Sequence, residues 1–95
     1  MKILDALLVL KEQALTNNVF YAAMGICTNL AGLTEDSDSS YDFVRDNCED
    51  WEHFSCDTSY PIEGYDDGHL WEGEQLELRL SLIDHLIAKA RELEI

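Results

Sequence analysis

Charged residues in this chain are confined to particular segments, and this segregation limits how the chain can fold. Residues 19–33 carry no charged side chain, whereas residues 34–74 carry fourteen acidic residues and a single base, Arg45. An uncharged segment of mostly apolar and small residues is typical of a buried helix. We therefore expect residues 20–33 to form a central helix and the acidic segment 34–74 to lie at the surface around it.

The overall composition fits a small globular protein with an unusual charge. The chain has 95 residues, 46% of them hydrophobic, and a net charge of -14 from 20 acids and 6 bases. Its length suits a single globular domain over residues 1–95, although self-repulsion of this size opposes compaction. The acidic excess disfavours direct binding to nucleic acid or to anionic lipid, and it favours basic partners.

The first thirteen residues lack the features of a secretory signal, because Asp5 interrupts their apolar stretch and no small-residue cleavage site follows. No apolar run approaches the 18 residues that a membrane span requires. Three cysteines, an odd number, indicate reduced thiols. We expect a cytoplasmic protein that does not insert into a membrane.

Hydrophobic periodicity predicts a mainly α fold of about four helices. The first, over residues 3–15, has a broad apolar face that includes Leu8 and Leu15 and that also offers a surface for a homodimer. The fourth, over residues 73–94, has the clearest stripe. The residues expected in that stripe are Leu76, Leu80, Ile83, Leu86, Ile87 and Ala90.

The third predicted helix spans residues 41–51, and the serines before it supply candidate N-caps. Tyr41, Val44, Cys48 and Trp51 recur on one face of this helix. The residues that follow, up to about residue 72, show no regular period. We expect them to form a long loop that is anchored by its aromatic side chains and that has room for a short hairpin.

Several short motifs occur in a recognisable order. They are "GICTNL" at 25–30, "WEHFS" at 51–55, "YPI" at 60–62, "LWEGE" at 70–74 and the leucine and isoleucine pattern that ends at residue 87. Over these residues the chain resembles a group of small uncharacterised proteins encoded by tailed bacteriophages and prophages. The resemblance implies a bacterial host cytoplasm, and it assigns no role to any residue because no activity is established for the group.

Metal binding and catalysis find little support in the sequence. Cys48, His53, Cys56 and His69 lie within 22 residues, but the two cysteines are eight positions apart, unlike the close pairs of structural zinc sites. The chain has no phosphate-binding glycine loop, no nucleophile elbow and no HExxH motif. We expect no structural metal, no cofactor and no enzymatic activity.

The acidic segment is either a solvated surface or a surface that imitates the phosphates of a nucleic acid. Glu49 and Asp50 favour the second interpretation, because acids near the end of a helix oppose its macrodipole. We predict an inhibitor, in an anti-defence role for example, that binds a basic host protein such as a nuclease or polymerase. The alternatives are a module that sequesters a nucleotide or another small ligand in its aromatic loop, and a virion or assembly component.

The predicted partner-binding residues combine carboxylates with two aromatic anchors. They are Glu35, Asp36, Asp38, Asp42, Asp46, Glu49, Asp50, Trp51, Glu52 and Phe54. The carboxylates would meet lysine and arginine side chains of the partner, which mainly accelerates association. Trp51 or Phe54 would supply the apolar contact that charges alone do not provide.

Overall fold

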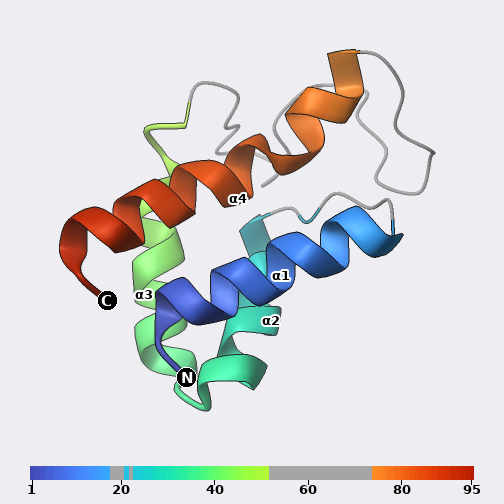
Figure 1. Cartoon of the computed structure of the whole chain (residues 1–95). Coiled ribbons are helices and arrows are strands. Elements are labelled where there is room, and N and C mark those ends of the chain that lie inside the picture. The colour runs from blue at the N-terminus through green and yellow to red at the C-terminus, as the bar shows by residue number, and fades with distance from the viewer. Residues whose placement is uncertain (18–20, 22, 52–73) are drawn as a thin grey trace.

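The computed structural model describes residues 1–17, 21, 23–51 and 74–95. These residues form four α-helices and no strand, which confirms the predicted mainly α fold (Figure 1). The helices are α1 (Ile3–Asn17), α2 (Ala23–Thr34), α3 (Ser37–Cys48) and α4 (Glu74–Leu93). The predicted loop and its hairpin lie outside the described residues. None of the described helices is long and apolar enough to cross a membrane.

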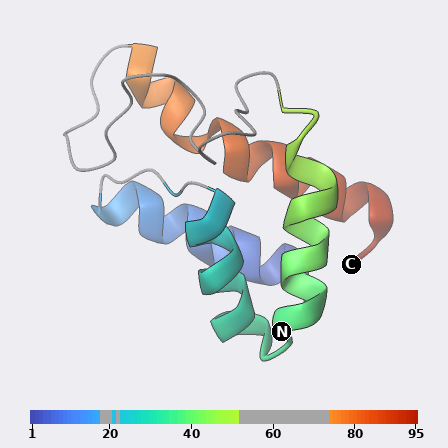
Figure 2. The same cartoon turned by 180° about the vertical axis from the view of Figure 1, so that it is seen from behind.

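The four helices pack in a closed arrangement in which each packs mainly against two others. α1 and α4 lie side by side and run in opposite directions, while α2 and α3 form an antiparallel pair joined by a short turn (Figures 1 and 2). α1 also packs on α2, and α3 on α4, so every helix gives one face to the same core. The two ends of the chain meet, because the amide of Leu4 donates to the carbonyl of Ile95 over 3.5 Å.

The core takes residues from all four helices and from Trp51. Its buried members are Ala6, Leu7, Leu10, Ala14, Ala23, Ile26, Cys27, Leu30, Phe43, Val44, Cys48, Trp51, Leu82, Ile83, Leu86, Ile87 and Ala90. Most of the stripe predicted for α4 is therefore found in the core. In α1 the core covers only part of the predicted broad apolar face, because Leu8 and Leu15 are 41% and 49% exposed. The homodimer through this face stays a prediction. α1 turns two leucines and two small alanines inward, and alanine lets neighbouring helices approach closely.

α2 is one wall of the core and not its centre. Ile26 and Leu30 are fully buried, but Met24 is 58% exposed and Thr28 and Gly32 also face solvent. The prediction of a wholly buried central helix is wrong on this point. Threonine, glycine and methionine carry no charge, yet they tolerate water, so an uncharged segment does not require burial on every side.

α3 begins four residues earlier than predicted and ends at Cys48, before Trp51. Asp36, and not a serine, is its N-cap, since the Asp36 carboxylate accepts a hydrogen bond of 3.1 Å from the backbone amide of Ser39. Glu35 before it has φ 58°, the left-handed backbone that ends α2 and turns the chain. Within α3 Phe43 is buried in the core and Tyr41 is 39% exposed, so the predicted buried face is wrong at Tyr41.

Candidate protein-interaction surface

Acidic side chains form a continuous row on the solvent side of α3. Asp38, Asp42 and Asp46 are spaced four residues apart, and Glu49 follows three residues later, so all four lie on one side of the helix. At 1.5 Å per residue the aspartates repeat about every 6 Å. The opposite side of α3 is buried through Val44 and its neighbours. With Glu35 and Asp36, which are also exposed, these four residues form what we call the acidic ridge.

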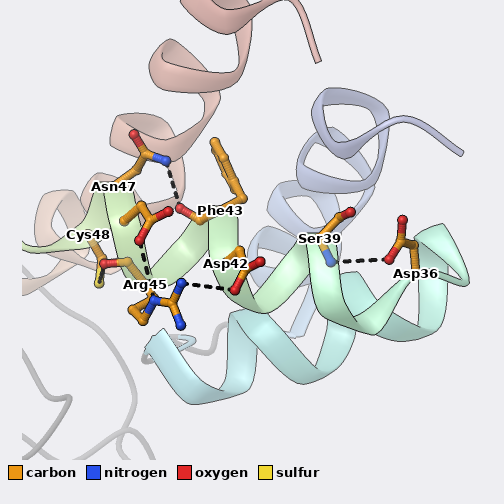
Figure 3. Close-up of polar contacts among 8 residues, drawn as sticks. Asp36, Ser39, Asp42, Phe43, Arg45, Asn47 and Cys48 are labelled. Atoms are coloured by element: carbon orange, nitrogen blue, oxygen red, sulfur yellow. Dashed lines mark hydrogen bonds and ion pairs between the residues drawn. The ribbon is translucent and has the colours of Figure 1, made fainter.

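Arg45 neutralises part of the acidic ridge. Its Nη2 lies 2.9 Å from Oδ1 of Asp42 (Figure 3). Its Nε lies 3.3 Å from Oδ1 of Asp46. The hydrogen bond to Asp46, followed by the charge of Asp42, raises the pKa of Arg45 above its usual value. All three side chains are well exposed, and exposed ion pairs of this kind contribute little to folding. Asp42 and Asp46 therefore remain accessible to solvent while they bind the guanidinium of Arg45.

Asp36 has a structural role as well as a charge. The hydrogen bonds that its carboxylate accepts from the backbone and side chain of Ser39 lower the pKa of Asp36. At the same turn the hydroxyl groups of Thr34 and the buried Ser40 lie 2.9 Å apart and connect α2 to α3. Substitution of Asp36 would thus disturb the start of α3 together with the acidic ridge.

Asp50 belongs to a different environment from the acidic ridge. Its Oδ1 lies 2.7 Å from Nε2 of His85 and its Oδ2 lies 2.8 Å from Nζ of Lys89, both on α4. Hydrogen bonds from Lys89 and then His85 lower the pKa of Asp50. The carbonyl oxygen of Asn47 is a second acceptor, 2.9 Å from the same ring nitrogen of His85, so this nitrogen carries a hydrogen.

This arrangement changes the interpretation of the two acids after Cys48. α3 ends at Cys48, Glu49 is its C-cap, and Asp50 lies beyond the helix. The expectation that Asp50 occupies the last turn against the macrodipole is therefore wrong. The ammonium group of Lys89 offsets the charge of Asp50, and His85 adds a hydrogen bond. We classify Asp50 as a residue that holds α3 against α4.

Two hollows border the acidic ridge, one on each side of α3. The larger, of about 530 Å³, lies against the start of α1 and the end of α4; Asp42 and Asp46 line it together with Ile3 and Leu93. The smaller, of about 270 Å³, lies between α2 and α3. Its lining is mainly apolar, with Arg45 and Glu49 as its charged members. The acidic ridge therefore runs between two surfaces that contain apolar side chains.

The remaining predicted site residues lie elsewhere. Trp51 is only 6% exposed and packs in the core, so little of its indole is accessible to a partner. Glu52 and Phe54 lie outside the described residues. So do the aromatic loop proposed to sequester a small ligand and the metal-ligand candidates His53, Cys56 and His69. Among the described residues no group of three histidine, cysteine or acidic side chains is placed to hold a metal ion.

The buried thiols of Cys27 and Cys48 are poor nucleophiles. Burial is the main cause that raises the pKa of Cys48, and burial together with the charge of Cys48 raises the pKa of Cys27 to about 11. Both thiols are free. Because the thiolate is the reactive form of cysteine, neither residue has the environment of a catalytic nucleophile.

Sequence reasoning identified the exposed acids of residues 35–50 but missed the contacts that Asp42 and Asp50 make. The pairing of Arg45 with Asp42 could have been found, because residues three apart are neighbours on a helix. The contact between Asp50 and His85 joins residues 35 positions apart and leaves no local signal.

Comparison of the chain with protein-family models, with curated proteins and with solved structures found no match.

Proposed function

We propose that this chain is a non-enzymatic inhibitor that binds a basic protein of a bacterial host through the acidic ridge. The observation that carries the proposal is the exposure of Asp38, Asp42, Asp46 and Glu49 in one row, opposite the buried side of α3. A groove that binds nucleic acid is lined by lysine and arginine, which pair with closely spaced phosphates. Carboxylates about 6 Å apart along a helix offer the same side chains an alternative set of anions.

The position of Arg45 fits a surface on which a basic side chain of the partner can replace this arginine. In the free protein its guanidinium bridges Asp42 and Asp46. A basic side chain of the partner would take over one of these carboxylates at small cost, because exposed ion pairs are weak. Arg45 thus lowers the repulsion within the ridge without blocking it.

Occupation of a basic groove by this chain would exclude nucleic acid from it. The partner class that fits is a nuclease, a polymerase or another nucleic-acid-binding protein, including enzymes of host defence. The resemblance to proteins of tailed bacteriophages supplies the setting, a bacterial cytoplasm during infection, in which such an inhibitor would benefit the phage.

The proposal is tested by affinity capture from bacterial lysate with two matched variants. The ridge variant carries Asp38→Asn, Asp42→Asn, Asp46→Asn and Glu49→Gln. The control variant loses the same number of charges elsewhere, through Asp5→Asn, Glu12→Gln, Glu92→Gln and Glu94→Gln, all exposed positions on α1 or at the end of α4. Asp50 is left intact in both because it contributes to the fold.

Mass spectrometry should find nucleic-acid-handling proteins with the wild type and the control variant, and these partners should be lost from the ridge variant and at high salt. Equal loss from both variants would mean that net charge alone causes the capture. If the ridge variant retains every partner, the acidic ridge is only a solvated surface. With a purified partner, Arg45→Gln should tighten binding a few-fold and steepen its salt dependence, because it frees two carboxylates.

A further inference from the structure

The hollow between α2 and α3 lies directly beside the acidic ridge. Cys27, Val44 and Cys48 are buried residues that line it, whereas Met24 and Tyr41 line it and are also exposed to solvent. With a volume of about 270 Å³ it has room for an apolar side chain from another molecule. Its two walls differ in charge, because α2 carries no charged residue and α3 carries the acidic ridge.

The charges around this hollow indicate the chemistry of its occupant. Arg45 and Glu49 line it directly, and Asp42 and Asp46 bind the guanidinium of Arg45, so three carboxylates surround one base. A second copy of this chain would bring a further net charge of -14 to this place and would be repelled. A segment that presents apolar side chains beside lysine or arginine is complementary both to the apolar lining of the hollow and to the negative charge around it.

A ridge of carboxylates requires an apolar contact for stable binding. Charge complementarity mainly accelerates association, whereas buried apolar and aromatic anchors dominate the affinity of most interfaces. Trp51 is packed in the core and is not exposed enough for this task. We propose that the hollow between α2 and α3 is the anchor site, and that it receives an apolar side chain from the same basic partner whose lysine and arginine residues pair with the acidic ridge. This inference rests on the proposed function. It adds the place on this chain where the partner is anchored and the kind of segment that the partner presents.

Two synthetic helical peptides serve as probes. The first carries leucines along one face with lysines on both borders, and the second has the same lysines but serine in place of each leucine. Binding of both is measured by fluorescence anisotropy at physiological salt. The protein variants are Met24→Gln in the hollow, Leu15→Gln as a control at another exposed apolar position of a helix, and the pair Asp42→Asn and Asp46→Asn in the ridge.

The leucine peptide should bind the wild type at least about tenfold more tightly than the serine peptide, as burial of one leucine side chain predicts. Met24→Gln should remove most of this advantage, and Leu15→Gln should leave it unchanged. The ridge variant should weaken both peptides alike. Circular dichroism checks that each variant keeps its helices, which the exposure of Met24 and Leu15 leads us to expect.

The outcomes separate the two proposals. If both peptides bind equally, the anchor site is refuted. If Met24→Gln has no effect while the ridge variant weakens both peptides, the anchor site is refuted and the proposed function of the acidic ridge is retained. If the ridge variant weakens neither peptide, the proposed function fails, and the anchor site fails with it. As a direct readout, the leucine peptide should slow the alkylation of Cys27 and Cys48, located by peptide mapping, and the serine peptide should not. Unchanged alkylation under saturating leucine peptide would also refute the anchor site.

Discussion

Oδ1 of Asp50 lies 2.7 Å from Nε2 of His85, and this contact joins the end of α3 to the middle of α4. The other oxygen of the same carboxylate lies 2.8 Å from the ammonium group of Lys89. Seven acidic residues between Glu35 and Asp50 are exposed, and Asp50 is the one among them that bridges two helices in the described part of the chain. Exposure and acidity alone therefore do not make a residue part of the interaction surface.

Loss of the Asp50 carboxylate should reduce stability more than loss of a ridge carboxylate. Asp50→Asn removes the ion pair with Lys89 and weakens the hydrogen bond from His85, so we expect the thermal midpoint to fall by a few degrees. Asp46→Asn, whose partner is the exposed Arg45, should leave the midpoint nearly unchanged. Differential scanning calorimetry at low and high salt measures the midpoints of both variants. The difference between the two midpoints should shrink at high salt, which screens the ion pair between Asp50 and Lys89. Equal midpoints for the two variants at low salt would contradict the role assigned to Asp50.

Stability should fall at acid pH through Asp50 and Asp36. Partners in the folded state lower the pKa of both carboxyls, so the unfolded chain takes up protons first as the pH falls. Their contribution is fully present above the ordinary carboxyl pKa, about 3.9, and is lost as the pH falls through the lower folded values. Urea unfolding from pH 6 down to pH 2 should show a smaller loss for Asp50→Asn than for the wild type. A loss of the same size in both would contradict this linkage.

The alkaline limit of stability should depend on Cys27. Burial and the nearby Cys48 raise the pKa of the Cys27 thiol to about 11 from an ordinary value of 9.0, so the unfolded chain releases this proton first as the pH rises. The stabilising contribution is present below pH 9 and is lost as the pH rises from 9 through 11. Cys27→Ala should therefore flatten the decline of stability over this range relative to its own value at pH 8. Ultraviolet absorbance of the thiolate, compared between the two proteins, follows the titration itself. A decline of the same steepness in the variant would exclude Cys27 as its source.

The buried face of α1 can be tested with two leucines that are two residues apart. Leu10 is fully buried, so Leu10→Ala should lower the free energy of unfolding by about 2–5 kcal/mol, through lost burial and the cavity left behind. Leu8 is 41% exposed, and Leu8→Ala should cost clearly less. Chemical denaturation of the two variants provides the comparison. A larger loss for Leu8→Ala than for Leu10→Ala would mean that α1 is rotated about its axis relative to this structure.

The sequence by itself determined the helical character of the chain and the location of its acidity. Helix formation depends on contacts between residues three or four apart, so the period of apolar residues around Ile83 and Leu86 was enough to predict α4 and most of its buried stripe. The acidity of residues 34–74 was found directly from the sequence, but Asp38 was expected before the third helix, and the earlier start of α3 is what brings it into the row with Asp42 and Asp46. The start of α3 was missed because aspartate and serine are comparable N-caps, and only the conformation of the turn after α2 selects Asp36.

Only the tertiary structure decided which of these residues are buried and which are paired. α1 carries leucine on several sides, and its packing against α2 and α4 is what buries Leu10 and leaves Leu8 exposed. The bond between Asp50 and His85 depends on the approach of α3 to α4, two segments that are distant along the chain. The same holds for the hollow between α2 and α3, whose shape depends on how these helices meet. Local periodicity specifies each helix, but the relative position of helices depends on the sum of many side-chain contacts between them, and no short stretch of sequence contains that sum.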